Sequence, residues 1–287
     1  MGSTQPLSAS AERATAILKA LRECRSDIDT LLSLLMPQDL ALPTVCTGWS
    51  VRDEIGHIID STEMLARGLE QAAAGEHEGI LRPKEMAKAM QTSAIERVAL
   101  LPLPQLQSVF KEVADRLLGL LESRSPNSWE EEVPHPYLGT CTAVQFAGLA
   151  LVDWFIHPWD IRTALQLRPQ PNNTHAALLI PGLVGIMPKR LDASRARGMR
   201  GRFRYIVVRK VVEEEEVINT IDLVLAANSA RVEGDVAEDV PADLTFRGQA
   251  GDLALAMLGR RGITPFVLPG PANETWLPRW GYLWISL

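Results

Sequence analysis

The sequence predicts an α+β protein in which a four-helix bundle precedes a smaller domain of strands and helices. Three observations support this fold class. Before residue 168, four long segments carry apolar residues at three- and four-residue spacing. The polar stretch RPQPNNTH interrupts this pattern at residues 168–175, and segments rich in alternating β-branched residues follow. Because 287 residues suffice for more than one core, we expect two domains, residues 1–170 and 175–287.

The first two helices are predicted over residues 8–36 and from residue 49 to about residue 74. In the first, apolar residues recur at helical spacing until Pro37 ends the helix. In the second, Ser50 is a suitable N-cap and Asp53 stands at the third helical position, which together form a capping box.

The remaining helices of the bundle are predicted over residues 102–123 and 142–167, with a shorter helix possible over residues 80–100. The 142–167 segment is apolar nearly all round, as expected for a helix that its neighbours surround. Pro158 lies inside it and cannot donate a backbone hydrogen bond, so we expect a bend there. Four long helices with medium loops predict the bundle.

The second domain is predicted to begin with a helix over residues 175–190 and to contain a second helix over residues 250–262 that Gly262 closes. Between them, alternation and β-branched residues predict strands. The expected strands cover residues 203–212, 217–227, 229–235 and 242–249. The acidic run at 213–216 is interpreted as a hairpin turn with its flanks rather than a metal site.

Composition excludes several classes of function. The net charge of -6 and the isoelectric point near 5.5 disfavour nucleic acid as a partner. The basic run at residues 189–204 is either an anion-binding strip or a solvated linker between domains. No segment reaches the roughly 18 apolar residues of a membrane-spanning helix, and the N-terminus lacks a secretory pattern. Three cysteines without a CxxC pair indicate reduced thiols, so we expect a cytoplasmic protein that is not bound to a membrane.

The segment DWFIHPWD, residues 153–160, raises the question of function. Asp153 and His157 stand four residues apart, so a helix places both side chains on one face within an apolar run. His57 lies on the apolar stripe of the second predicted helix and faces the same interior. Two imidazoles and a carboxylate are the donors of a catalytic zinc site with one open position. The alternative is that Asp153 and His157 only pair with each other to hold their helix in register.

Three motifs resemble the mycothiol-dependent maleylpyruvate isomerase family, within the wider DinB-like metalloenzymes. They are LPTVCTGWSVRDEIGHIID, LVDWFIHPWDIRTAL and LTFRGQAGDLALAMLGRRG, in this order. The resemblance covers nearly the whole chain and implies a DinB-like four-helix bundle followed by a sterol-carrier-like α+β domain.

The resemblance also implies roles for individual residues. His57 and His157 match the two metal-binding histidines, and Asp153 stands where these isomerases usually have a glutamate. Asp160 matches an aspartate that supports a ligand or caps the helix. Arg260 falls on the family's GR pair, with Arg261 as the fallback; either arginine would clamp a carboxylate of the substrate or of the thiol cofactor, and each has the alternative of complementing a helix end.

The implied activity is that of a metal-dependent isomerase or S-transferase. Its cosubstrate would be mycothiol or another low-molecular-weight thiol, its substrate a small electrophile, and its metal a divalent ion, with zinc the first choice. The alternative is a non-catalytic binding protein whose second domain holds an apolar ligand or protein partner. In that case Trp276, Trp280 and Trp284 would form an interaction surface instead of a stripe covering the core.

Overall fold

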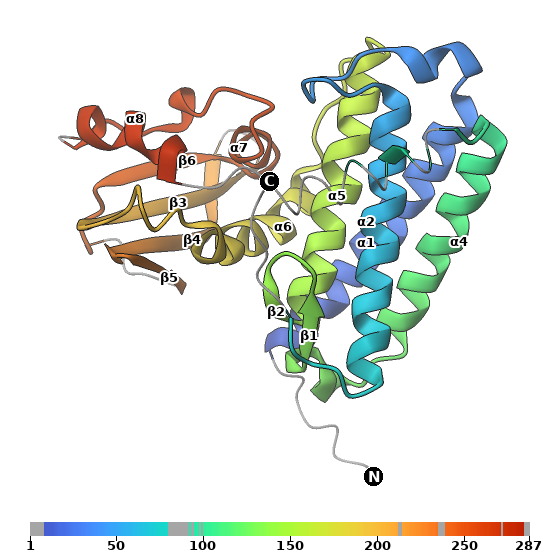
Figure 1. Ribbon diagram of the computed structural model, residues 1–287. Helices are drawn as coiled ribbons and strands as arrows, with labels where there is room; N and C mark the ends of the chain where they lie inside the picture. The colour runs from blue at the N-terminus through green and yellow to red at the C-terminus, as the bar shows by residue number, and fades with distance from the viewer. Residues whose placement is uncertain are drawn as a thin grey trace. The chain divides into compact units, whose positions relative to one another are not determined.

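The computed structural model describes residues 9–79, 92, 95–96, 98, 100–211, 214–234, 239–270 and 272–283. Within it, the chain divides into two compact units, Met1–Gln170 and Pro171–Leu287. The α+β class is confirmed: the first unit is mainly helical and the second contains a sheet (Figure 1). The division into a four-helix bundle with a metal site, residues 1–170, and an α+β domain, residues 175–287, stays a prediction.

Four long helices make up most of the described part of the first unit. They are α1 (Ala9–Leu34), α2 (Val51–Ala73), α4 (Leu103–Glu122) and α5 (Ala143–Ala164). α1 and α2 each pack against both α4 and α5, which gives a closed bundle. The short helix expected over residues 80–100 lies mostly outside the described residues. Among the described helices, none is long and apolar enough to cross a membrane.

The N-terminal starts of α2 and α5 lie where their capping sequences predict. Ser50 accepts a hydrogen bond from the backbone N–H of Asp53, whose side chain accepts one from the backbone N–H of Ser50 at 2.8 Å. At α5, Thr142 and Gln145 form the same reciprocal pair. α5 continues as helix through Pro158, with most of its residues buried on every side. α2 and α5 carry the candidate site.

A small hairpin that the sequence analysis did not predict joins the bundle between α4 and α5. Its strands are β1 (Glu132–His135) and β2 (Gly139–Thr142), which pair antiparallel. The buried ring of His135 fixes the turn, because its Nδ1 accepts hydrogen bonds from the backbone N–H groups of Tyr137 and Leu138, both at 3.1 Å. The helix-like spacing of nearby apolar residues gave no sign of these four-residue strands.

Close packing of α2 against this hairpin gives a test of the bundle. A Cβ atom added at Gly68 would lie 2.8 Å from Cε1 of Phe146 and 2.8 Å from the carbonyl oxygen of Pro134. We therefore expect Gly68→Ala to lower the free energy of unfolding by about 1–3 kcal/mol, as overpacking does. Gly119→Ala is the matched control, because nothing lies within 4 Å of its added Cβ in α4. It should instead raise that free energy by about 0.5–1 kcal/mol, and urea denaturation that gave both variants the same sign would contradict the packing.

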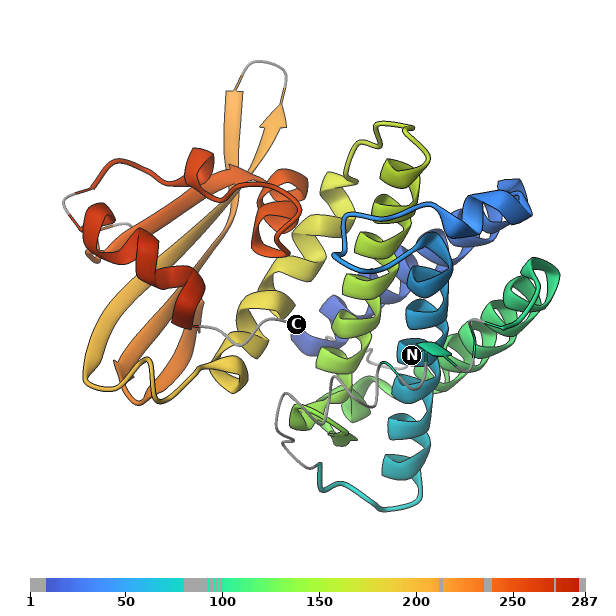
Figure 2. The same ribbon diagram turned by 45° about the horizontal axis from the view of Figure 1, so that its top comes forward.

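The second unit is built on a four-stranded sheet in the order β5-β4-β3-β6. Its strands are β3 (Met199–Val211), β4 (Glu214–Ala227), β5 (Ser229–Gly234) and β6 (Leu244–Gln249), and its helices are α6 (Asn173–Ile186), α7 (Ala250–Met257) and α8 (Asn273–Leu283). β3 pairs antiparallel with β4 and parallel with β6. Figure 2 shows α8 lying across the strands.

Tryptophans of α8 belong to the core of this unit. Trp276 and Trp280 are buried, and the indole N–H of Trp280 donates to the hydroxyl of Tyr205 at 3.1 Å. The ring of Trp276 would lie 2.9 Å from a Cβ atom added at Gly201, so a glycine is needed there for close approach. The idea that these two tryptophans form an exposed interaction surface is therefore wrong; Trp284 lies outside the described residues.

Two further expectations need correction. Gly259, with φ +77°, follows Leu258, the C-cap of α7, and takes the left-handed conformation expected of Gly262. The basic run at residues 189–204 is not a linker between the units, because it starts in the short helix Met187–Arg190 and ends in β3, both within the second unit. Asp192 organises the turn between this helix and β3, because its carboxylate accepts a hydrogen bond from the backbone N–H of Ser194 at 3.0 Å.

Candidate metal centre

His57, Asp153 and His157 lie together inside the bundle. His57 comes from α2 and the other two from α5. The Nε2 atom of His57 is 4.0 Å from Oδ1 of Asp153, and Nε2 of His157 is 3.9 Å from the same oxygen. One donor atom from each residue lies within 4.8 Å of the others. All three side chains that the sequence analysis chose as ligands therefore meet at one point, while their role as ligands stays a prediction.

The three side chains are mostly enclosed but not sealed. Side-chain exposure is 14% for His57 and 24% for Asp153, against 7% for His157. The rings of the two histidines meet edge to face, with centroids 4.5 Å apart. Trp49, which precedes α2, packs against both, with its ring centroid 5.0 Å from that of His57. His57 and Asp153 thus form the solvent-accessible side of the cluster and His157 its inner side.

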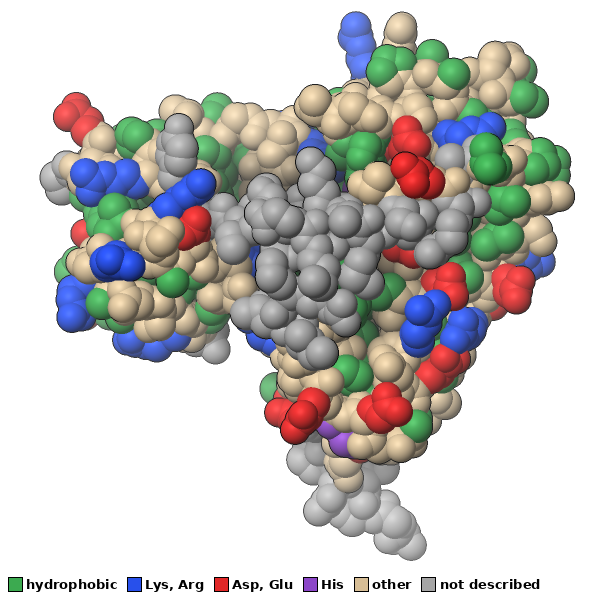
Figure 3. Space-filling model, in the orientation of Figure 1, with side chains coloured by type: hydrophobic (Ala, Val, Ile, Leu, Met, Phe, Trp, Pro, Cys, Tyr) green, Lys and Arg blue, Asp and Glu red, His purple; other side chains and the backbone are tan. Residues whose placement is uncertain are grey.

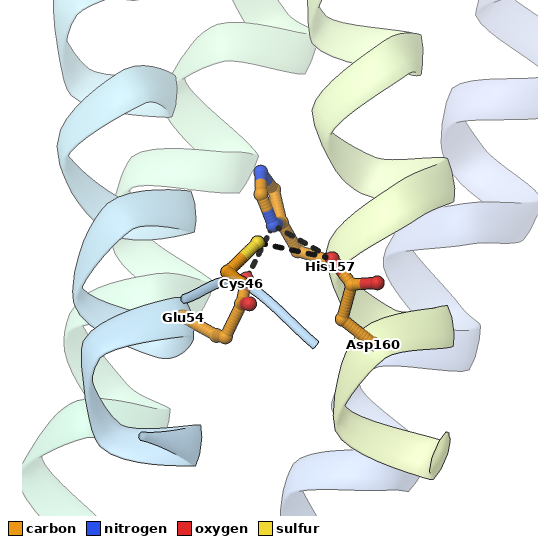
Figure 4. A group of neighbouring side chains, drawn as sticks. All are labelled: Cys46, Glu54, His157 and Asp160. Carbon is orange, nitrogen blue, oxygen red and sulfur yellow. Dashed lines mark hydrogen bonds and ion pairs between the residues drawn. The ribbon is translucent and has the colours of Figure 1, made fainter. Parts of the chain in front are cut away.

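A second group of side chains surrounds the other nitrogen of His157 (Figure 4). It comprises Glu54 on α2, Asp160 on α5 and Cys46 in the loop before α2, and all of them lie within 4.8 Å of one another. Nδ1 of His157 contacts Oε2 of Glu54 and is 3.5 Å from Oδ2 of Asp160. Cys46 donates from Sγ to the same oxygen of Asp160 at 3.7 Å.

The electrostatics of this cluster favour a positive charge. Glu54 and Asp160 are fully buried, and Asp153 adds a third carboxylate nearby. The pKa of His157 is raised to about 9: burial lowers it, but hydrogen bonds to Asp160 and Glu54, together with the charges of Glu54 and Asp153, outweigh burial. A buried imidazole that holds its proton this strongly indicates an environment able to stabilise a cation.

The donor set fits a divalent ion of the zinc type. Donor atoms at roughly 2.0–2.1 Å from a tetrahedral zinc lie about 3.3 Å from one another. The 3.9 and 4.0 Å separations between the histidine nitrogens and Asp153 are about 0.6–0.7 Å wider, a difference that small side-chain rotations cover. Two imidazole nitrogens and one carboxylate leave the fourth position to an external ligand, as in catalytic zinc sites. The shorter aspartate therefore does not prevent the three residues from converging.

The sequence analysis predicted a role for Asp160 but none for Glu54. Asp160 was expected to support a ligand, and it lies beside the ring of His157. Glu54 was missed, although it precedes His57 by three residues and so shares its face of α2. Cys46 approaches Asp160 only through the fold of the 42–50 loop.

Arg260 and Arg261 follow α7 in the second unit. The guanidinium of Arg260 donates to the backbone carbonyl of Leu258 at 2.7 Å, and that of Arg261 pairs with Asp252. Both backbone N–H groups donate to the carbonyl of Leu255, which completes the end of the helix. These contacts are those of residues at a helix end, and a role of either arginine toward a substrate or thiol stays a prediction.

Comparison with known proteins agrees with this architecture. Residues 21–162 match the family model of the mycothiol maleylpyruvate isomerase N-terminal domain. The crystal structure of the mycothiol-dependent maleylpyruvate isomerase is similar in fold, with a TM-score of 0.58 and 16% sequence identity over 90% of this chain and 95% of that one. A histidine-to-alanine mutant of that enzyme gives a TM-score of 0.57 at 14% identity, over 88% of this chain and 91% of the other.

No curated protein matches the chain in sequence. At 14–16% identity, the two crystal structures establish the fold that this chain shares with them. The family model is the more specific finding, because it covers α2 and α5 up to residue 162 and hence all of the residues around His157. The helical part of this chain belongs to the family of mycothiol maleylpyruvate isomerase N-terminal domains.

Proposed function

We propose that this protein is a metal- and thiol-dependent enzyme that isomerises a small electrophile or joins it to the thiol. The observation that carries the proposal is the convergence of His57, His157 and Asp153 with both Nε2 atoms directed at one carboxylate. Membership of the mycothiol maleylpyruvate isomerase family supports mycothiol as the thiol and an unsaturated acid as the substrate class.

His57, Asp153 and His157 would hold the ion. When bound, a divalent metal supplies a Lewis acid that keeps a thiol ligand deprotonated at neutral pH, where a free thiol with a pKa near 8.5 is mostly protonated. Trp49 lines the two histidine rings and would exclude water from that side of the thiol. The more exposed edges of His57 and Asp153 would face the incoming cosubstrate.

The reaction balances without an external oxidant or reductant. In isomerisation, the sulfur adds to one carbon of the substrate's double bond and the electron pair moves onto the conjugated carbonyl. The former double bond then rotates, the electron pair returns, and the thiolate leaves unchanged. In S-transfer the carbon–sulfur bond stays, and the adjacent carbon takes up a proton. Arg260 would bind a carboxylate of the substrate or thiol in either case, with Arg261 as the second choice.

The alternative is a non-catalytic binding protein whose second domain holds an apolar ligand or a protein partner. The burial of Trp276 and Trp280 removes the tryptophan surface as an argument for it. Activity itself tests the proposal. Purified protein loaded with zinc should isomerise maleylpyruvate, or another unsaturated acid, only when mycothiol is present. Equal turnover with and without any thiol would contradict the thiol-dependent reaction.

A thiol that binds the folded metal-loaded protein should also stabilise it. At a mycothiol concentration 100 times the dissociation constant, linkage predicts a gain of about 2.7 kcal/mol and hence a higher melting temperature. We expect this shift with mycothiol and smaller shifts with bacillithiol and glutathione, measured by differential scanning fluorimetry. A protein in which His157 is replaced by alanine should show none, and an unchanged melting temperature with all three thiols would exclude thiol binding.

A further inference from the structure

The two nitrogens of the His157 ring face different groups of side chains. Nε2 lies toward Asp153 and His57, while Nδ1 contacts Glu54 and lies 3.5 Å from Asp160. A ring can present only one of its nitrogens to an ion, and the partner of the other nitrogen decides which one. The side chains around Nδ1 therefore determine whether Nε2 is the nitrogen presented to an ion.

Glu54 is unusual for a carboxylate because it is completely buried. Burying a carboxylate is strongly unfavourable unless both oxygens find partners. Here the hydroxyl of Thr44 donates to Oε1 at 2.9 Å, and Oε2 contacts the ring of His157.

Thr44 is itself held in place by the loop before α2. Its hydroxyl lies 3.2 Å from the carbonyl oxygen of Trp49, and its backbone N–H donates to that oxygen at 2.9 Å. The backbone N–H of Cys46 also donates to the Thr44 hydroxyl, at 3.2 Å. Loop, α2 and α5 are thus connected through one line of polar contacts, Thr44 to Glu54 to His157.

We propose that Glu54 is a positioning residue, whose buried carboxylate, fixed by Thr44, holds Nδ1 of His157 and thereby turns Nε2 toward His57 and Asp153. Asp160 lies on the same helix as His157, three residues later, and restricts the ring from its own side. Glu54 reaches it from the neighbouring helix, so it also sets the separation of α2 and α5 at the site. A carboxylate partner further makes Nε2 a better donor to a metal.

The part of this inference that concerns metal binding rests on the proposed function, whereas the orientation of the ring does not. Three variants separate charge, hydrogen bonding and the connection to the loop: Glu54→Gln, Glu54→Leu and Thr44→Val. Glu63→Gln is the matched control, because it makes the same change on the same helix at an exposed glutamate that pairs with Arg67.

Zinc affinity, measured by competition with a chromophoric chelator, is the first readout. We expect Glu54→Leu to weaken affinity roughly 10–100-fold, the usual effect of losing a partner of a metal-binding histidine. Glu54→Gln keeps an acceptor oxygen and should recover part of that loss, and Thr44→Val should fall between wild type and Glu54→Leu. Glu63→Gln should bind zinc as wild type does.

The second readout is the ring itself, in crystals of the metal-free variants. In wild type and Glu63→Gln, Nε2 of His157 should point to Asp153, while in Glu54→Leu the ring should turn or occupy two rotamers. In NMR spectra of the cobalt-loaded protein, the proton on Nδ1 of His157 should give a paramagnetically shifted signal that exchanges slowly with water. In Glu54→Leu this proton should exchange faster.

Two results would overturn the inference. One is an unchanged ring and unchanged zinc affinity in Glu54→Leu. The other is a second zinc ion per chain that is lost in Cys46→Ser, since the residues around Nδ1 would then bind a cation of their own. If wild type binds no metal at all, the proposed function fails, and the metal-free crystals still decide whether Glu54 orients the ring.

Discussion

Replacing His157 with alanine should abolish stoichiometric metal binding. We expect the zinc affinity to fall by more than about 100-fold, beyond the roughly 10–100-fold cost of losing an outer partner. The reason is geometric, because Nε2 of His157 and Nε2 of His57 are the two donors that converge on Asp153. Metal content after dialysis, measured by mass spectrometry, should drop from about one ion per chain to a small fraction.

His175→Ala is the control for this experiment. His175 is also a buried histidine, with 7% exposure, but it lies at the start of α6 in the second unit. Its replacement removes an imidazole from the core of the second unit and leaves every residue of the candidate centre unchanged. A full metal content in His157→Ala, or an equal loss in both variants, would contradict the assignment of His157 as a ligand.

Asp222→Ala should cause the largest loss of stability. Asp222 is fully buried on β4, and both of its oxygens accept hydrogen bonds from Arg204 on the neighbouring strand β3, at 2.8 and 2.9 Å. Arg202 adds a further bond to Oδ2 at 2.6 Å. Removing the carboxylate leaves the buried guanidinium of Arg204 without its counterion, and breaking such a pair costs about 3–5 kcal/mol.

An exposed pair on the same two strands provides the comparison. Arg209 on β3 pairs with Glu216 on β4 at 2.5 Å, with side-chain exposures of 60% and 53%. Because solvent screens such a pair, Glu216→Ala should change stability by no more than about 1 kcal/mol. Native-state hydrogen exchange of β3 and β4 amides measures both variants in the second unit. A loss below 1 kcal/mol in Asp222→Ala would show that the network is not stabilising.

The starts of two long helices could be predicted from local sequence. Ser50 with Asp53, and Thr142 with Gln145, are reciprocal caps that depend only on residues three apart, so the starts of α2 and α5 were predictable. The hairpin before α5 was not, because its strands have four residues each and their pairing depends on contacts with the bundle. The end of α7 was misplaced because the segment LGRRG contains two glycines, Gly259 and Gly262, and only the backbone conformation distinguishes them.

The candidate site was likewise predictable from the sequence only in part. Asp153 and His157 were found because a four-residue spacing on a helix has one geometric meaning. The contribution of Glu54 depends on how closely α2 approaches α5, and that of Cys46 on the path of a loop. A helical-face argument applied to Glu54 and His57 would have identified the glutamate as inward-facing. Its contact with Nδ1 of His157 follows only from the assembled bundle.

The most direct test is a crystal structure of the metal-loaded protein with anomalous scattering recorded at the absorption edge of the bound metal. The account predicts one anomalous peak, within bonding distance of Nε2 of His57, Nε2 of His157 and a carboxylate oxygen of Asp153. A peak on the Nδ1 side of His157, among Cys46, Glu54 and Asp160, would contradict it, as would a metal-loaded crystal with no peak at these side chains.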